Sequence, residues 1–339
     1  MTAVIAKPFM MDAAAPAWPI SFAEILAAKE RLSPFLTPTP LRHYPLLDTH
    51  VGGGTSLLIK HENHQPTCSF KVRNGLSFVT ALSAEERKRG VVAASTGNHG
   101  QGIAYAAHLL GVRATICVPV GNNPEKSIAM KSWGATVVEA GTSYDDSVDA
   151  MLRIARDEGR VVAHSTNDAR VLAGAATMSL EMMEQSGGLD AVVIAGGGGS
   201  QSVGALTVAR ELAPGLPVYG VQTAGAPAIH DSWHAKATLR TDKADTFAEG
   251  VATRQPYGMT FATLTAGLSG FVTVTDAEVA EAIRLILKLS HNLVEGAGAL
   301  GVAGAIKLRD HLKGKRVGVI FSGANLDTAV LRRILAGEL

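Results

Sequence analysis

The chain has 339 residues, of which 47% are hydrophobic and 36 are glycine, so it is long enough for two α/β domains with many tight turns. Its 31 basic and 30 acidic residues are spread evenly, and neither a basic stripe for nucleic acid nor an apolar run for a membrane span is present. Two cysteines, Cys68 and Cys117, give no disulfide framework and no metal motif, so we expect a cytoplasmic protein.

The N-terminus lacks the charged start and long apolar core of a secretory signal. Residues 1–19 are expected to form an arm, loosely held where alanine and proline are frequent between residues 10 and 19. The first clear strand of the chain follows at residues 57–60.

From residue 90 onward, apolar strand, polar turn and amphipathic helix follow one another repeatedly. The predicted strands cover 91–94, 114–118 and 136–138, and the helices after them stop at Gly111, Gly134 and Gly159. Glycine suits the left-handed residue that ends a helix. Alternating strands and helices indicate βαβ units and a parallel sheet, so we predict a small domain over residues 90–165.

A second run of the same kind predicts a larger, discontinuous domain. Its strands cover 191–195, 218–221 and 317–321, with a helix from about residue 202 to 212. Thr275 and Glu278 form a capping box for another helix, and segment 225–270, with weak periodicity, is expected to be surface structure near the site. We therefore predict an α/β fold of two open twisted sheets flanked by helices, with residues 20–89 and 166–339 forming the large domain.

Four consecutive glycines, Gly196, Gly197, Gly198 and Gly199, lie between a predicted strand and a helix. Backbone N–H groups in such a turn, together with the positive end of the helix dipole, bind a phosphate. The spacing fits neither a dinucleotide GxGxxG motif, because Gln201 and Ser202 follow, nor a P-loop. A tight turn needs fewer glycines, so we favour a phosphate site.

Lys71 stands in the apolar sequence Ser69-Phe70-Lys71-Val72-Arg73. Desolvation would lower the pKa of its amine and favour nucleophilic chemistry. The same pattern is compatible with an ordinary solvated lysine, so Lys71 by itself decides nothing.

Two further turns carry polar groups at predicted strand ends. The run from Ser95 through Thr96, Gly97, Asn98 and His99 begins a helix and offers N–H and hydroxyl groups to a carboxylate. N-capping alone would also explain the first two residues. Ser322 follows the last strand, where parallel sheets bind ligands or where a helix is capped.

Together these segments resemble the fold-type II pyridoxal phosphate family of threonine and serine dehydratases and serine racemase, over about residues 20–339. The resemblance is carried by His61-Glu62-Asn63, the Lys71 segment, Thr96-Gly97-Asn98-His99-Gly100-Gln101-Gly102, the four glycines and Ser322-Gly323. It implies that pyridoxal 5′-phosphate is the cofactor and that the reaction is removal of the β-hydroxyl and amino groups from a hydroxy-amino acid.

The resemblance also implies residue roles. Lys71 would bind the cofactor as a Schiff base and move the Cα proton, and Asn98 would face the cofactor's 3′-oxygen. Gly196 to Gly199 would hold the phosphate and Ser322 would face the pyridine nitrogen. Ser95, Thr96, Gly97 and His99 would bind the substrate carboxylate, and Glu249 and Glu295 match family positions near the ring less firmly.

The chain departs from the family pattern near this lysine. Cys68 and Asn74 replace glycines, and His64 and Thr96 are also unusual, so a bulkier substrate such as phenylserine is one interpretation. Gln222 and Ala228 stand at the racemase metal carboxylates, so we expect no metal there. The partner we expect is a small-molecule amino-acid substrate, and the composition favours neither nucleic acid nor membrane. A homodimer is expected from the resemblance.

Several alternatives remain open at this point. Within the pyridoxal enzymes these are a racemase that uses Lys71 and Thr96 on opposite faces and a β-replacement enzyme. Outside them are a ligand-binding protein without catalysis and a nicotinamide oxidoreductase, although the glycine spacing disfavours the latter.

Overall fold

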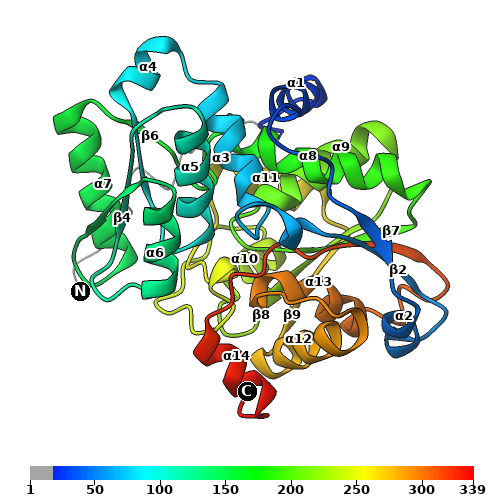
Figure 1. Cartoon of the computed structure of the whole chain (residues 1–339). Helices are drawn as coiled ribbons and strands as arrows, with labels where there is room; N and C mark the ends of the chain where they lie inside the picture. Colours follow the sequence, from blue (N-terminus) through cyan, green and yellow to red (C-terminus); the bar gives the residue numbers. More distant parts are fainter. Residues whose placement is uncertain (1–17) are drawn as a thin grey trace.

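The computed structural model describes residues 18–339, which contain two mainly parallel sheets on either side of helix α3 (Lys71–Thr80) (Figure 1). The larger sheet consists, in spatial order, of β1 (Leu41–His43), β2 (Ser56–Lys60), β10 (Arg316–Ile320), β7 (Ala191–Ala195), β8 (Val218–Thr223) and β9 (Gly270–Val274). Only β1 pairs antiparallel with its neighbour; the other pairs in this sheet are parallel.

Both faces of the larger sheet are covered by helices, because alternate side chains of each strand point to opposite faces. In β7, Ala191 and Val193 belong to one core cluster, while Val192 and Ile194 belong to the other. The first cluster includes α2 (Pro45–Val51), α12 (Asp276–Ser290), α13 (Gly296–Lys307) and α14 (Thr328–Leu335). The second includes α1 (Phe22–Leu32), α8 (Ala169–Ser186), α9 (Ser200–Leu212), α10 (Ala228–Ala235) and α11 (Gly258–Gly267).

The smaller sheet has the order β5 (Thr136–Glu139), β4 (Ala114–Val118), β3 (Val91–Ala94) and β6 (Val161–Val162), and all of its pairs are parallel. It follows α4 (Ala84–Arg89) in the chain. Residues of α5 (Asn98–Leu109) and α6 (Pro124–Ser132) pack on one face, and α7 (Tyr144–Glu158) packs on the other.

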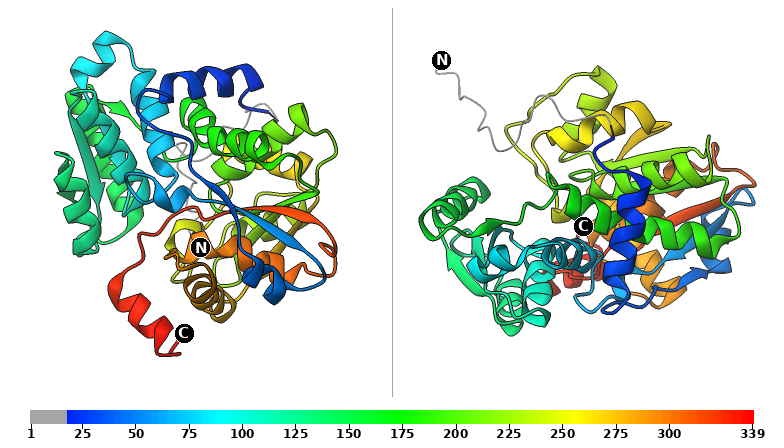
Figure 2. Two further views of the ribbon diagram at one scale, coloured as in Figure 1. Left: turned by 45° about the vertical axis from the view of Figure 1, so that its right-hand side comes forward. Right: turned by 90° about the horizontal axis from the view of Figure 1, so that it is seen from above.

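Helix α3 lies between the two sheets and touches helices of both parts (Figure 2). Its Gly75 is so close to α5 that an added Cβ would lie 2.1 Å from the carbonyl oxygen of Gly102. On the α8 side, a Cβ on Gly174 would lie 2.5 Å from the carbonyl oxygen of Arg73. The backbone of α3 is therefore packed directly against the two helices beside it.

The predicted fold class, two sheets flanked by helices, is confirmed. Gly111, Gly134 and Gly159 have the expected left-handed φ, between +64° and +78°. The domain limits stay a prediction, and most of the expected N-terminal arm lies outside the described residues. Among the residues that the structure describes, no helix is long and apolar enough to cross a membrane.

Segment 225–270 borders the cavity described below, as expected. It also contains helices α10 and α11 and the 3₁₀ turn Glu249–Val251, which weak periodicity did not predict, because buried contacts rather than periodicity stabilise them. Two other local expectations were wrong. The helix after the glycine run begins at Ser200, two residues earlier than expected. Trp18, at the end of the expected loose arm, packs its ring against the guanidinium of Arg210.

Candidate active site

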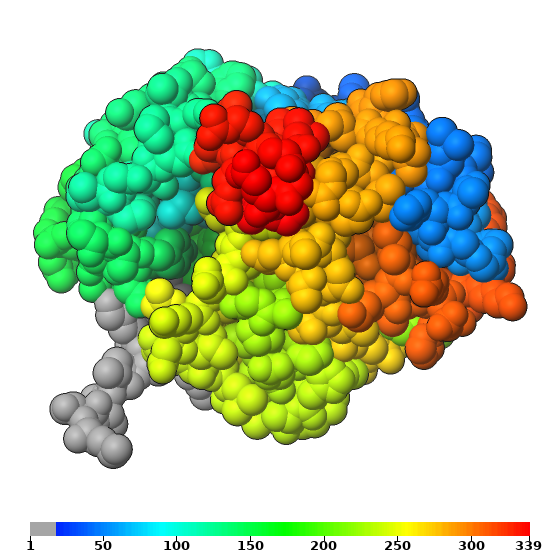
Figure 3. Space-filling model, turned by 90° about the horizontal axis from the view of Figure 1, so that it is seen from below, coloured from blue at the N-terminus to red at the C-terminus, as the bar shows by residue number. Residues whose placement is uncertain are grey.

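A cavity of about 690 Å³ lies between the two sheets, where parallel strands of both end. The turns after β3, β4, β6, β7 and β10 all contribute lining residues, among them Ser95, Pro119, Ser165, Gly197 and Ser322. In the space-filling view, a recess separates the green surface of the small sheet's helices from the yellow segment of the other part (Figure 3). The carboxyl ends of parallel strands are where α/β folds bind ligands.

Lys71 begins helix α3 and lines the cavity. Its amine donates a hydrogen bond of 3.2 Å to the carbonyl oxygen of Ser165 and lies 5.1 Å from the centre of the Phe70 ring. Desolvation lowers the pKa of Lys71 from 10.5 to about 8, although the nearby Glu295 carboxylate opposes this shift. The amine is therefore prepared to act as a nucleophile near neutral pH.

Within the described part of the chain, three of the four glycines in the run present free N–H groups to the cavity. The N–H groups of Gly197, Gly198 and Gly199 donate to no protein acceptor within residues 18–339, and all three residues line the cavity before the N-terminus of α9. A Cβ on Gly197 would lie 2.8 Å from the Gly250 oxygen, and one on Gly198 would lie 2.6 Å from the Thr166 hydroxyl.

Gly196 requires a correction, because it does not line the cavity. Its N–H donates to the carbonyl oxygen of Val221 at 2.7 Å, which extends the pairing of β7 with β8. An added Cβ would lie 2.4 Å from the Phe271 ring. Glycine is therefore needed at this position for packing rather than for anion binding.

The turn after β3 is organised differently from the expected carboxylate site. The Ser95 hydroxyl accepts hydrogen bonds from the N–H groups of Gly97 (3.2 Å) and Gly100 (2.9 Å), so it mainly stabilises the turn. The His99 ring bonds through Nε2 to the carbonyl oxygen of Ala163, and burial lowers its pKa to about 3. Within residues 18–339, the groups left for a carboxylate are Thr96, the N–H groups of Asn98 and His99, and the Nδ1 atom of the His99 ring, which has no hydrogen-bond partner.

Asn98 is held between two other side chains that line the cavity. Its Nδ2 donates to Glu295 at 2.6 Å, and its Oδ1 accepts from Asn325 at 2.7 Å. The Glu295 carboxyl is partly buried, and desolvation raises its pKa to about 7. The second N–H of the Asn98 amide remains for a ligand.

Ser322 is brought next to Lys71 by backbone pairing. The N–H of Phe70 donates to the Ser322 carbonyl oxygen at 2.9 Å, and Ser69 forms a bridge with Gly323. The Ser322 side chain is buried and lines the cavity. Lys71, Ser322, Asn98 and the glycine turn, predicted from four distant segments, therefore share one cavity.

Several lining residues were not predicted, notably Lys126, Tyr144, Thr166, Arg254 and Tyr257. Lys126 pairs with Glu249 across the cavity, and the ring of Tyr257 lies beside Gly198. Tyr144 follows the predicted strand at 136–138. The rule that parallel strands present their carboxyl ends at one edge could have identified this residue from the sequence.

Cys68 has a left-handed backbone, with φ of +52°, three residues before Lys71. A Cβ in this conformation costs roughly 1–2 kcal/mol, so glycine would relieve strain. We expect Cys68→Gly to raise the free energy of unfolding by up to about 1 kcal/mol. The gain is smaller than the relieved strain, because glycine also increases the entropy of the unfolded chain, which opposes folding. Urea unfolding measures this effect, and Cys68→Ala, which keeps the Cβ, is the control. Equal stabilities of the two variants would contradict the expectation.

Comparison with known proteins identifies the family. A model described as "Pyridoxal-phosphate dependent enzyme" matches residues 32–323. The chain belongs to this pyridoxal-phosphate dependent enzyme family. Its fold-type II architecture and its cofactor, expected from the sequence, are thereby confirmed.

Relatives within the family are ammonia-lyases. L-threonine ammonia-lyase of Thermotoga maritima is 36% identical over 316 residues, covering 93% of this chain and 78% of that protein. L-threo-3-hydroxyaspartate ammonia-lyase of a Pseudomonas species is 34% identical, covering 94% and 99%. Among solved structures, the processed form of threonine deaminase isoform 2 from Solanum lycopersicum has a TM-score of 0.87 at 30% identity, covering 93% of this chain and 86% of that chain. Maize serine racemase has a TM-score of 0.88 at 25% identity, covering 94% and 97%.

The residues present in the cavity fit pyridoxal phosphate. Three N–H groups without a protein acceptor within residues 18–339, at a helix N-terminus, match phosphate oxygens. A Cβ on Gly197 or Gly198 would collide with Gly250 or Thr166, so this turn requires glycine at both positions. Lys71 supplies an amine of lowered pKa in the same cavity, and Ser322 supplies a hydroxyl.

Proposed function

We propose that this enzyme is a dehydratase that converts a β-hydroxy-α-amino acid into a 2-oxo acid and ammonia by α,β-elimination. The observation that carries the proposal is the desolvated amine of Lys71 in a cavity shared with the glycine turn and Ser322. The two ammonia-lyases named above match more than nine-tenths of this chain, and they support the reaction class.

We assign the cofactor contacts to residues that line the cavity. Lys71 would hold the cofactor covalently, Gly197 to Gly199 would bind its phosphate, and Asn98 would donate to its 3′-oxygen. Ser322 would face the pyridine nitrogen. A neutral hydroxyl there cannot donate a proton as a carboxylic acid would.

When bound, pyridoxal phosphate delocalises the electron pair released at the substrate Cα, which is the chemistry that the protein lacks. The chain's own residues then bind the substrate and move protons. Thr96 and the N–H groups of the first turn of α5 would bind its carboxylate. The Nζ atom of Lys71, freed when the substrate amine takes its place, would accept the Cα proton. The β-hydroxyl leaves as water, and hydrolysis of the resulting enamine gives the 2-oxo acid and ammonia.

The lowered pKa of Lys71 predicts how capture of the cofactor depends on pH. Only the unprotonated amine attacks an aldehyde, and with a pKa of about 8 roughly one amine in ten is unprotonated at pH 7. The rate at which the cofactor-free chain binds pyridoxal phosphate should rise about tenfold per pH unit below pH 8 and level off above it. Stopped-flow absorbance measures this rate. A rise that continues to pH 10 would mean an ordinary, solvated lysine.

Side chains with aromatic or apolar surface line much of the cavity, including Val120, Tyr144, Phe247, Tyr257 and Leu326. This lining supports a substrate with a bulkier side chain than serine or threonine, such as phenylserine.

A panel of L-serine, L-threonine, threo-phenylserine and threo-3-hydroxyaspartate tests both the reaction and the substrate. We expect equal amounts of 2-oxo acid and ammonia, with the highest kcat/KM for phenylserine. If serine or threonine gives the highest kcat/KM, the proposed elimination stands and the proposal of a bulky substrate is wrong. Formation of D-amino acid faster than 2-oxo acid would show that the enzyme is a racemase. A product that forms only with added thiol would show that it catalyses β-replacement.

Racemisation is the less supported alternative, because the curated relatives named above are ammonia-lyases. Membership of the family argues against the binding protein and the nicotinamide oxidoreductase. A homodimer, a cytoplasmic location and the absence of a metal stay predictions.

A further inference from the structure

Helix α3 starts at Lys71 without a side-chain cap, although the position of this turn determines where the reactive amine lies. The residue before it, Phe70, makes no side-chain hydrogen bond to the first turn. A rotation of α3 by about 10° would move an atom on a side chain by about 1 Å, since side chains reach about 6 Å from the helix axis. Something must therefore fix the helix against rotation.

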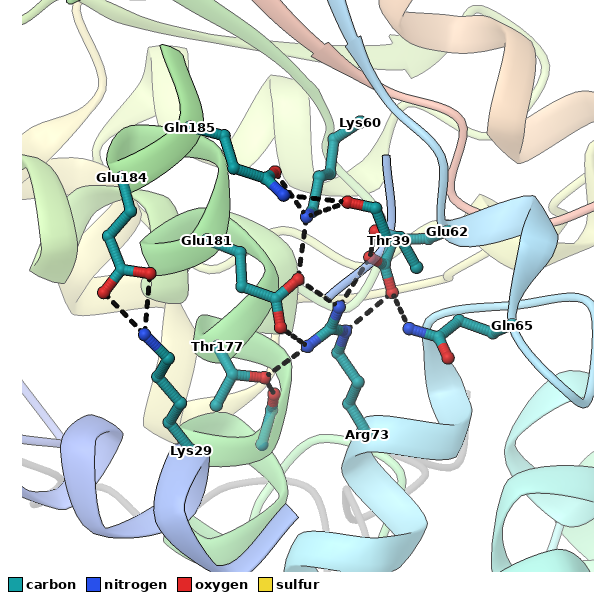
Figure 4. A network of polar contacts seen from close by, with 11 residues as sticks. Lys29, Thr39, Lys60, Glu62, Gln65, Arg73, Thr177, Glu181, Glu184 and Gln185 are labelled. Carbon is teal, nitrogen blue, oxygen red and sulfur yellow. Dashed lines mark hydrogen bonds and ion pairs between the residues drawn. The ribbon is translucent and has the colours of Figure 1, made fainter. Parts of the chain in front are cut away.

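Arg73, two residues after Lys71, is anchored in a buried ionic network (Figure 4). Its Nε and Nη2 donate to the two Glu62 oxygens at 2.7 and 2.9 Å, and its Nη1 and Nη2 donate to the two Glu181 oxygens at 2.7 Å each. Nη1 also donates to Thr177 at 3.1 Å. All five N–H donors of the guanidinium are thus used.

The network connects α3 to elements on the far side from the cavity. Glu62 follows β2, Glu181 lies on α8, and Lys60 at the end of β2 donates to Glu181, to the Thr39 carbonyl oxygen and to Gln185. Residues two apart on a helix point about 200° apart. Lys71 therefore faces the cavity while Arg73 holds the opposite side of the same turn.

We infer that Arg73 is a positioning residue for Lys71. The planar guanidinium of Arg73 is fixed by two carboxylates, Glu62 just after β2 and Glu181 on α8, and this prevents α3 from rotating. The close contacts at Gly75 and Gly174 hold α3 between its neighbouring helices. Because glycine has no side chain to interlock with the facing helix, these contacts resist rotation of α3 about its axis only weakly. Lysine cannot reproduce the bidentate contacts that give the guanidinium its fixed orientation. The inference rests on the proposed role of Lys71.

The test compares two variants that each remove one buried cation from the same network, Arg73→Met and Lys60→Met. Lys60 donates its hydrogen bonds to Thr39, Glu181 and Gln185 and to no residue of the first turn of α3, so its loss should lower stability but leave that turn fixed. The readout is the pH midpoint for labelling of Lys71 by an amine reagent in the full-length, cofactor-free chain. The charged or titratable groups near Lys71 are Glu295, His99 and His164, so neither variant removes a charge that acts on its amine.

We expect the Lys71 midpoint to rise from about 8 toward 10.5 in Arg73→Met, because the amine becomes solvated, and to stay near 8 in Lys60→Met. In the loaded enzyme, kcat of Arg73→Met should fall more than about tenfold with little change in KM. If Arg73→Met does not fold, Arg73→Lys takes its place and should shift the midpoint in the same direction. Equal midpoints in the Arg73 and Lys60 variants would overturn the inference. Because labelling needs no substrate, it is independent of whether elimination is the reaction.

Discussion

Replacing Lys71 by alanine should abolish covalent binding of pyridoxal phosphate and lower the rate of elimination by about 10⁴-fold or more. The variant loses both the amine that holds the cofactor and the base that accepts the Cα proton. Lys126, which also lines the cavity, is paired with Glu249 and does not replace this amine. Borohydride reduction followed by peptide mass spectrometry should find the cofactor on residue 71 of the native enzyme and on no residue of the variant.

Lys307→Ala provides the matched control for this experiment. Lys307 is an exposed lysine on α13 that pairs with Glu278 on the surface, away from the cavity. Its replacement should leave both labelling and rate as in the native enzyme. Cofactor found on a different lysine of the native chain would refute the assignment of Lys71.

Replacing Glu181 by glutamine should destabilise the protein by about 3–5 kcal/mol, because Lys60 would lose its ion-pair partner and Arg73 would lose one of its two. Glu181 accepts from both Arg73 and Lys60, and all three side chains are almost fully buried. Such a loss is a large part of the roughly 5–15 kcal/mol that typically stabilises a protein. The shift in the urea unfolding midpoint, measured on the loaded enzyme, tests the expectation.

Glu184→Gln is the matched control on the same helix. Glu184 lies on α8 close to Glu181 and pairs with Lys29, but both side chains are exposed, by 43% and 36% (Figure 4). Surface pairs contribute roughly 0–1 kcal/mol, so the midpoint should hardly move. Equal shifts of the unfolding midpoint in the two variants would mean that burial of the network does not increase the destabilisation caused by losing one carboxylate.

Much of the fold follows from local patterns in the sequence. The strands at 91–94, 114–118 and 191–195 follow from short continuous apolar runs, and the helix ends follow from glycines that adopt a left-handed backbone. Both are properties of neighbouring residues. The same holds for the glycine run, because a strand, a glycine turn and a helix N-terminus are continuous in the chain. Helix α11 was missed because its buried contacts come from elsewhere in the chain.

The site residues divide in the same way. Lys71, Asn98 and Ser322 could be named from motifs, whereas the exclusion of Gly196, the use of the Ser95 hydroxyl inside its own turn and the orientation of His99 required the structure. Each of these depends on which acceptor the tertiary fold brings within hydrogen-bond distance.

The ionic network around Arg73 shows most clearly what could not be predicted from the sequence. Arg73 and Glu181 are 108 residues apart, and nothing in either sequence segment indicates a partner. The sequence by itself determined the strands and the turns, because these depend on local conformation and residue type, and the family motifs singled out Lys71 as the proposed reactive lysine. Only the tertiary structure decided the pKa of Lys71 and the partners of Arg73, because desolvation and ion pairing depend on distances between distant segments.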